Sequence, residues 1–78
     1  MIQIDLIKRV TTDPEVMGGK PVIRGLRITV DQVLKALAGG LTVDVLLKDY
    51  PELEKEDVQA ALIYAAELVE EEKVFAIR

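Results

Sequence analysis

The sequence contains no cysteine, histidine, serine or tryptophan. Without cysteine the chain can form neither disulfides nor thiolate metal sites. Without histidine it lacks the commonest zinc ligand and the commonest general base near neutral pH. A serine nucleophile is excluded, and no histidine is available to activate a threonine. We therefore expect that the chain is not an enzyme and that it holds no metal and no cofactor.

Two short patterns resemble ligand sites but fail on their spacing. Gly19-Lys20 would suit a phosphate-binding loop, yet that pattern needs a glycine five residues before Gly19 and a hydroxyl residue after Lys20, and both positions are prolines. Three successive glutamates at 70–72 could attract a divalent ion. Successive side chains on a helix point in different directions, so a solvated helix end is the better interpretation.

Long apolar runs are also missing. No stretch of about 18 apolar residues exists, and the first five residues do not form a signal peptide. We therefore expect a cytoplasmic protein that does not enter a membrane. The length of 78 residues predicts one domain, residues 1–78. A domain of this size buries only about 60% of its unfolded surface, so an oligomer would be a natural way to bury more.

The net charge of −4 is unevenly distributed along the chain. Residues 1–38 hold six basic and four acidic side chains, whereas residues 39–78 hold four basic and ten acidic ones. The acidic pI of about 4.7 argues against general affinity for nucleic acid. The basic first half could still face phosphate or an acidic protein site. The alternative is that charges of both signs only solvate the surface.

An extended lead-in with turns is expected over residues 2–30. Alternating apolar residues predict one strand within residues 2–11, with a helical turn around residues 5–8 as the alternative. A proline at position 14 ends this element. Gly18-Gly19 and Arg24-Gly25 predict two turns. Residues 26–30 are rich in β-branched side chains and predict a second strand, paired with the first.

Three helices are expected over residues 31–72, which makes the fold class mainly α. They run from residue 31 to the glycines at 39 and 40, from residue 43 to the turn at Tyr50-Pro51, and from about residue 54 to residue 72. Thr29 and Gln32 have the spacing of a capping box before the first helix, and Thr42 caps the second.

The longest helix has two expected sides. The core stripe consists of Val58, Ala61, Leu62, Ala65, Leu68 and Val69. The opposite side holds Glu56, Gln59, Ala60, Ile63 and Glu67. A lone exposed isoleucine such as Ile63 is ordinary, and a partner contact is the alternative. The apolar tail at residues 73–78 could be a short strand, a frayed end or a segment ordered by a partner.

The second and third helices, with a turn at residues 50–53 between them, have the spacing of a helix-turn-helix. In that motif the first exposed residues of the second helix reach base edges in the major groove. Lys55 and Gln59 would do so here, and glutamine suits adenine. Glu54, Glu56 and Asp57 would together repel phosphate, so a packed core without DNA contact is the alternative.

The most specific pattern lies in residues 13–30, which read Asp-Pro-x-Val-x-Gly-Gly-Lys-Pro-Val-Ile-Arg-Gly-x-Arg-Ile-Thr-Val. Two helices follow, the second ending in Asp-Tyr-Pro, and then Leu-x-x-Glu-Asp-Val-x-Ala-Ala-Leu-x-Tyr-Ala. Over residues 7–69 this resembles a family of short prokaryotic proteins, long catalogued as a domain of unknown function and regarded as VapB-type antitoxin-like proteins. The matching signature positions are Asp13, Pro14, Gly18, Gly19, Lys20, Pro21, Gly25, Arg27, Tyr50 and Pro51.

The resemblance implies a homeodomain-like three-helix bundle with a helix-turn-helix and a small N-terminal β-hairpin-like element. It further implies a homodimer that binds operator DNA, represses its own operon and neutralises a PIN-like nuclease toxin, a ribonuclease that uses clustered carboxylates and Mg²⁺. The chain departs from the pattern at Leu26, where a small hydroxyl residue is usual, and at Glu54, where a threonine commonly caps the helix. It also lacks the long tail with which many antitoxins wrap a toxin.

These observations define the candidate contact residues. We expect nucleic-acid contacts from Lys20, Arg24, Arg27, Lys55 and Gln59. We expect contacts with a protein partner from Arg24, Arg27, Ile63, Phe75 and Ile77. An arginine could enter the carboxylate cluster of the nuclease in place of its metal. The alternative function is a protein-interaction module that uses the three-helix fold as a scaffold and does not bind DNA.

Overall fold

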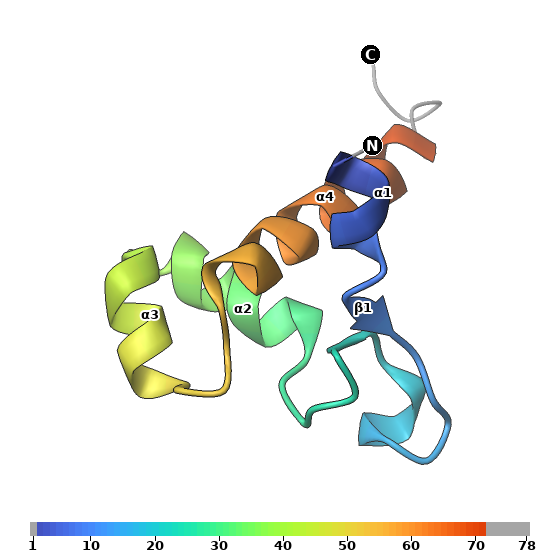
Figure 1. Cartoon of the computed structure of the whole chain (residues 1–78), viewed down its shortest axis with the longest axis horizontal. Coiled ribbons are helices and arrows are strands. Elements are labelled where there is room, and N and C mark those ends of the chain that lie inside the picture. Colours follow the sequence, from blue (N-terminus) through green and yellow to red (C-terminus); the bar gives the residue numbers. More distant parts are fainter. Residues whose placement is uncertain (1, 72–78) are drawn as a thin grey trace.

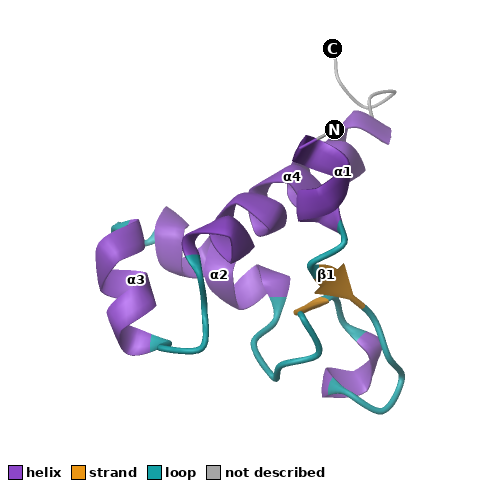
Figure 2. Cartoon of the chain, in the orientation of Figure 1, coloured by secondary structure: helices purple, strands orange, loops and turns teal. Residues whose placement is uncertain are grey.

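The computed structural model describes the backbone of residues 2–71 and the side chains of residues 5–71. In chain order its elements are α1 (Ile2–Ile7), β1 (Val10–Thr11), a 3-10 helix (Met17–Gly19), β2 (Val22–Ile23), α2 (Val30–Ala38), α3 (Val43–Asp49) and α4 (Lys55–Glu71). Figure 1 and Figure 2 show a mainly helical fold in which α4 contacts α2 and α3 towards one end and α1 towards the other. No helix in this described part is long and apolar enough to cross a membrane.

The N-terminal segment is mostly helical, so the predicted strand within residues 2–11 is wrong for residues 2–7. Only Val10–Thr11 is a strand, and the alternative of a helical turn near residues 5–8 was closer. α1 packs against α4, and its residues Leu6 and Ile7 are half-buried. Alternation over so few residues fits one side of a short helix as well as a strand, and the contact with α4 decides between them.

The second predicted strand is displaced towards the N-terminus. β1 pairs antiparallel with β2, and Val10 lies opposite Ile23. Residues 26–30 are not a strand: they form a bend, a single bridge between Thr29 and Val22, and the first residue of α2. The expected pairing of two N-terminal strands is therefore found, but the second strand lies before the Arg24-Gly25 turn rather than after it.

The Arg24-Gly25 turn explains this displacement. Both residues have positive φ angles, of 47° and 73°. The N–H group of Leu26 donates a hydrogen bond to the carbonyl of Ile23 at 2.7 Å, which closes the turn. Because left-handed residues reverse the chain sharply, β2 ends after two residues and the following segment returns beside it.

The predicted helix ends are confirmed at α2. The Thr29 hydroxyl accepts from the Gln32 N–H at 3.2 Å, and the Gln32 side chain accepts from the Thr29 N–H at 2.9 Å. At the other end Gly40 has a φ of 103°, and the Leu41 N–H donates to the Ala36 carbonyl at 3.1 Å. This is the Schellman pattern that favours glycine after a helix.

The core lies where α2, α3, α4 and β2 meet. Its buried members are Ile23, Ile28, Val30, Val33, Leu46, Leu53, Val58 and Ala61. The predicted core stripe of α4 is only partly right, because Leu62, Leu68 and Val69 are exposed whereas Ala60, assigned to the opposite side, is buried. Asp57 is fully buried together with Val58, Ala60 and Ala61, and Leu62 and Val69 fall outside the side of α4 that these residues define. The predicted stripe was built from apolar residues alone, and an aspartate is ordinarily expected to be exposed to solvent.

Candidate functional site

The helix-turn-helix succession is formed by α3, the turn after it and α4. The Thr42 hydroxyl caps α3 by accepting from the Val45 N–H at 3.2 Å. Leu46 in α3 and Leu53 in the turn are buried, and the Leu53 N–H donates to the Tyr50 carbonyl at 2.9 Å. These contacts fix the turn, so the start of α4 has a defined position relative to α3.

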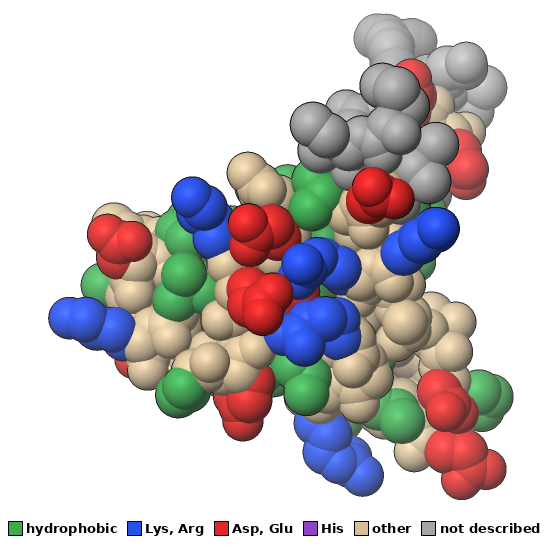
Figure 3. All heavy atoms as spheres, viewed as in Figure 1, with side chains coloured by type: hydrophobic (Ala, Val, Ile, Leu, Met, Phe, Trp, Pro, Cys, Tyr) green, Lys and Arg blue, Asp and Glu red, His purple; other side chains and the backbone are tan. Residues whose placement is uncertain are grey.

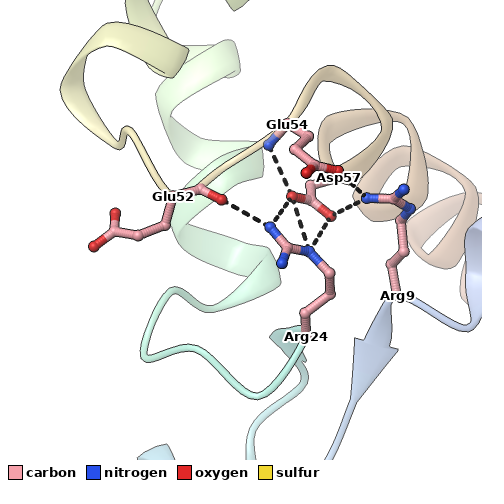
Figure 4. A network of polar contacts seen from close by, with 5 residues as sticks. All are labelled: Arg9, Arg24, Glu52, Glu54 and Asp57. Carbon is pink, nitrogen blue, oxygen red and sulfur yellow. Dashed lines mark hydrogen bonds and ion pairs between the residues drawn. The ribbon is translucent and has the colours of Figure 1, made fainter.

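A buried carboxylate holds the start of α4. Asp57 lies between the side chains of Arg9 and Arg24 (Figure 4). Arg24 binds it at two points, with Nε 3.0 Å from Oδ1 and Nη2 2.8 Å from Oδ2. Nη1 of Arg9 is 2.9 Å from Oδ1 of Asp57 and 2.8 Å from the Glu54 carboxylate. Two-point pairing of a guanidinium with a carboxylate combines strength with fixed geometry.

Asp57 also caps α4. Its Oδ2 accepts from the N–H of Glu54 at 2.8 Å. Glu54 precedes the first residue of α4 and Asp57 is the third residue of the helix, so this bond is one half of a capping box. The side chain of Asp57 therefore supplies a hydrogen bond at a helix start where the threonine expected from the resemblance is absent.

Arg24 connects the β-turn to the helix-turn-helix. Besides Asp57, its Nη2 donates to the Glu52 carbonyl in the turn before α4 at 2.7 Å. Arg24 has a left-handed backbone conformation, which costs about 1–2 kcal/mol for any residue that carries a side chain. The bonds to Asp57 and Glu52 offset this cost, because the same backbone conformation directs the guanidinium to both acceptors. We name Arg9, Arg24, Glu54 and Asp57 the Asp57 cluster.

The environment of Asp57 acts on its pKa in two directions. Burial raises the pKa, and it is the largest single influence. The hydrogen bonds from Arg24, from the Glu54 N–H and from Arg9 lower it, and together they leave the pKa of Asp57 below its ordinary value. The carboxylate is therefore charged throughout the neutral range, and the two arginines are bound as cations.

The depressed pKa of Asp57 predicts acid sensitivity. Protonation is harder in the folded chain than in the unfolded one, where the pKa is about 3.9. The stability from this shift is fully present above the unfolded pKa and is lost as the pH falls through the folded pKa, at about 1.4 kcal/mol for each pKa unit. We expect the free energy of unfolding, measured with urea, to fall as the pH is lowered from about 5 to about 3.

The exposed carboxylate of Asp31 is the relevant control, since its pKa is also lowered, chiefly by a hydrogen bond with Thr29. The Asp31→Asn variant should keep the acid sensitivity. If the free energy of unfolding of Asp31→Asn did not change between about pH 5 and about pH 3, the acid sensitivity would not be caused by Asp57.

The three predicted basic residues of the N-terminal segment do not act together. Arg24 faces α4 and is bound to Asp57. Lys20 is exposed, with its Nζ 3.7 Å from a carboxylate oxygen of Asp31. Arg27 is exposed, and its Nη1 lies 3.7 Å from the sulfur of Met17. Lys20 and Arg27 are therefore open to a ligand, whereas Arg24, although 36% exposed, is already paired with Asp57.

The predicted contact residues of α4 differ in their exposure to solvent. Lys55 and Gln59 are exposed at its start, and Ile63 is half-buried. Phe75 and Ile77 lie outside the described residues. Within the part that the structure describes, no group of three or more histidine, cysteine or acidic side chains is placed to hold a metal ion.

Sequence reasoning missed the Asp57 cluster. Arg9 was not considered as a site residue, and Asp57 was counted among the acids that repel phosphate. A local signal existed, because Asp57 lies three residues after Glu54, where an acidic side chain can accept from the first free amide of a helix. Its arginine partners could not be found in this way, because they lie 33 and 48 positions away in the chain.

Comparison with known proteins places the chain in a family. Residues 10–65 match the family described as "Protein of unknown function (DUF433)". An uncharacterized protein, y4eO of Sinorhizobium fredii, is 41% identical over 56 residues, which cover 72% of this chain and 25% of that protein. The chain thus spans about a quarter of the length of this curated relative. No solved structure matches. The chain belongs to the DUF433 family.

Proposed function

We propose that the chain is an antitoxin-like regulator that binds operator DNA and neutralises a PIN-like ribonuclease. The observation that carries this proposal is the helix-turn-helix of α3 and α4 with an exposed polar start of α4. Lys55 and Gln59 lie there, at positions that reach base edges in helix-turn-helix proteins. The resemblance of residues 13–30 to antitoxin-like proteins supports the same function.

Electrostatics limit how tightly one copy could bind DNA. Figure 3 shows basic and acidic side chains next to each other on one face, rather than a continuous basic patch. At the start of α4 the exposed Glu54 and Glu56 flank Lys55 and repel phosphate. Lys20 and Arg27 are the exposed cations of the N-terminal turns that do not bind Asp57. A homodimer would double these contacts over two half-sites, so the dimer is part of the proposal.

A protein-interaction module without DNA binding is the second candidate. The acidic start of α4 favours it, because exposed Glu52, Glu54 and Glu56 suit a basic protein surface better than phosphate. Arg24 supports it as well, since its place in the Asp57 cluster removes one of the expected phosphate contacts. The helix-turn-helix would then serve as a scaffold.

A mobility-shift assay with the DNA upstream of the chain's own gene separates the two candidates. We expect binding that weakens steeply between about 50 and about 200 mM salt, because each neutralised phosphate releases counterions. Lys20→Glu combined with Arg27→Glu should weaken binding at least about tenfold. Lys8→Glu, an exposed charge change before β1, is the control and should weaken it less. Absence of a shift at the lowest salt would exclude the repressor.

The nuclease is tested separately. The chain is mixed in equal amounts with a nuclease-like protein encoded beside it, one with clustered aspartates and glutamates, and RNA cleavage is measured. We expect cleavage to be suppressed and the two proteins to elute together on gel filtration. Unchanged cleavage without a complex would exclude the antitoxin role for that pair.

A further inference from the structure

The outer half of α4 exposes a row of apolar side chains. Leu62 and Val69 are 49% and 69% exposed, and Ala66 between them is exposed too. These positions, i, i+4 and i+7, lie on one side of a helix. Single exposed apolar residues are ordinary, but a continuous row on one helix marks an interaction surface. We name Leu62, Ala66 and Val69 the α4 stripe.

The charged side chains of the outer half of α4 are of one sign. Glu67, Glu70 and Glu71 are exposed on the same part of the helix, and residues 60–71 contain no lysine or arginine. The C-terminal end of a helix carries a partial negative charge, which acidic side chains aggravate and cations relieve. The last turn of α4, as far as the structure describes it (to residue 71), has no basic residue. Figure 1 shows this end of α4 continuing past α2 and α3, and among the described elements α1 lies beside it.

We propose that the α4 stripe is the docking site for an amphipathic helix of a partner protein, with aliphatic residues on its buried side and lysines or arginines beside them. The aliphatic residues would cover Leu62 and Val69, and the small Ala66 permits close approach of the two helices. The cations would pair with Glu70, which flanks the stripe on the helix surface, and with the negative end of α4. This inference rests on the part of the proposed function that gives the chain a protein partner, and it does not depend on DNA binding.

A second copy of the chain is the poorer occupant. Two α4 helices could bring their apolar rows together. Residues 60–71 of the second copy would, however, bring a second Glu70 and no cation to the same interface. Like charges along paired helices are destabilising, and the helix end would stay uncompensated. The matched family region ends at residue 65, so the stripe extends into a part of the chain beyond that match.

Fluorescence anisotropy with two synthetic helical peptides tests the proposal on the full chain. One peptide has a leucine and alanine side flanked by lysines, and the other has glutamate in place of each lysine. We expect the lysine peptide to bind at least about tenfold more tightly than the glutamate peptide. Leu62→Ser with Val69→Ser should weaken it at least about tenfold. Val45→Ser, at a 44% exposed position of α3, is the matched control and should leave binding unchanged.

Other outcomes overturn the proposal. Equal binding of the lysine peptide to the wild type and to the folded Leu62→Ser, Val69→Ser variant would do so. So would a wild-type dimer, seen by sedimentation, that these substitutions convert to monomers, because the stripe would then belong to a second copy. A nuclease that binds this variant as tightly as the wild type would overturn the docking site and leave the proposed function intact. The absence of a mobility shift would contradict the DNA-binding part of the proposed function and would leave the docking site unaffected.

Discussion

The Asp57→Asn variant is expected to lose about 3 kcal/mol of its free energy of unfolding. Asparagine keeps the shape of the side chain but removes the negative charge to which both Arg9 and Arg24 bind. Its amide N–H groups would also face the N–H groups of these arginines. Breaking a buried ion pair costs about 3–5 kcal/mol, and the lower value applies because the arginine side chains are 29% and 36% exposed. Against a total of roughly 4–12 kcal/mol for a chain of this length, that loss is large.

Urea unfolding followed by circular dichroism at neutral pH measures this loss. Asp44→Asn is the matched control, because Asp44 lies exposed in the first turn of α3 and the substitution changes the same group. Its midpoint should stay close to that of the wild type, as is usual for surface positions. If the midpoints of Asp57→Asn and Asp44→Asn coincided, the Asp57 cluster would not stabilise the fold.

The Asp57 cluster changes how the arginines must be tested. Reversing the charge of Arg24 would remove a bidentate partner of a buried carboxylate, so a loss of DNA or nuclease binding in such a variant could be a loss of folding. Arg27 and Lys20 do not have this difficulty, since both are exposed and neither contacts Asp57. A binding role is therefore best examined at these two positions.

The helices and their ends were predictable because their signals are local. The capping box of Thr29 and Gln32 spans four residues, and Thr42 accepts from an amide three residues away. The glycines at the end of α2 likewise act on their own backbone. Such interactions depend little on the rest of the fold, so the expected three helices are found close to their predicted ranges.

The errors lie where distant segments meet. The alternating residues at the N-terminus become a helix because α4 packs against them. The second strand moves because Ile23, which precedes the Arg24-Gly25 turn, lies opposite Val10. The inner side of α4 includes Asp57, whose partners come from the N-terminal segment. None of these contacts has a signal in the local sequence.

The segment that identifies the family is largely a structural device. Between residues 13 and 30 the chain makes two turns, forms β2, supplies Arg24 to the Asp57 cluster and caps α2 with Thr29. Lys20 and Arg27 are its exposed basic residues outside the Asp57 cluster, and they are the ones left for a ligand. Much of the pattern would therefore be required for folding even if the segment bound nothing.

Ile23→Ala is the sharpest test of this structural role, with an expected loss of about 2–5 kcal/mol in the free energy of unfolding. Ile23 is fully buried in the core and pairs with Val10 in the sheet. Alanine keeps its backbone bonds to Leu26 and Ile28 but leaves a cavity between β2 and the helices. Ile23→Val, the matched control, removes one methylene and should cost about 0.5–1.5 kcal/mol by urea unfolding. Equal, small losses in both variants, together with lost ligand binding, would instead make the segment a binding element.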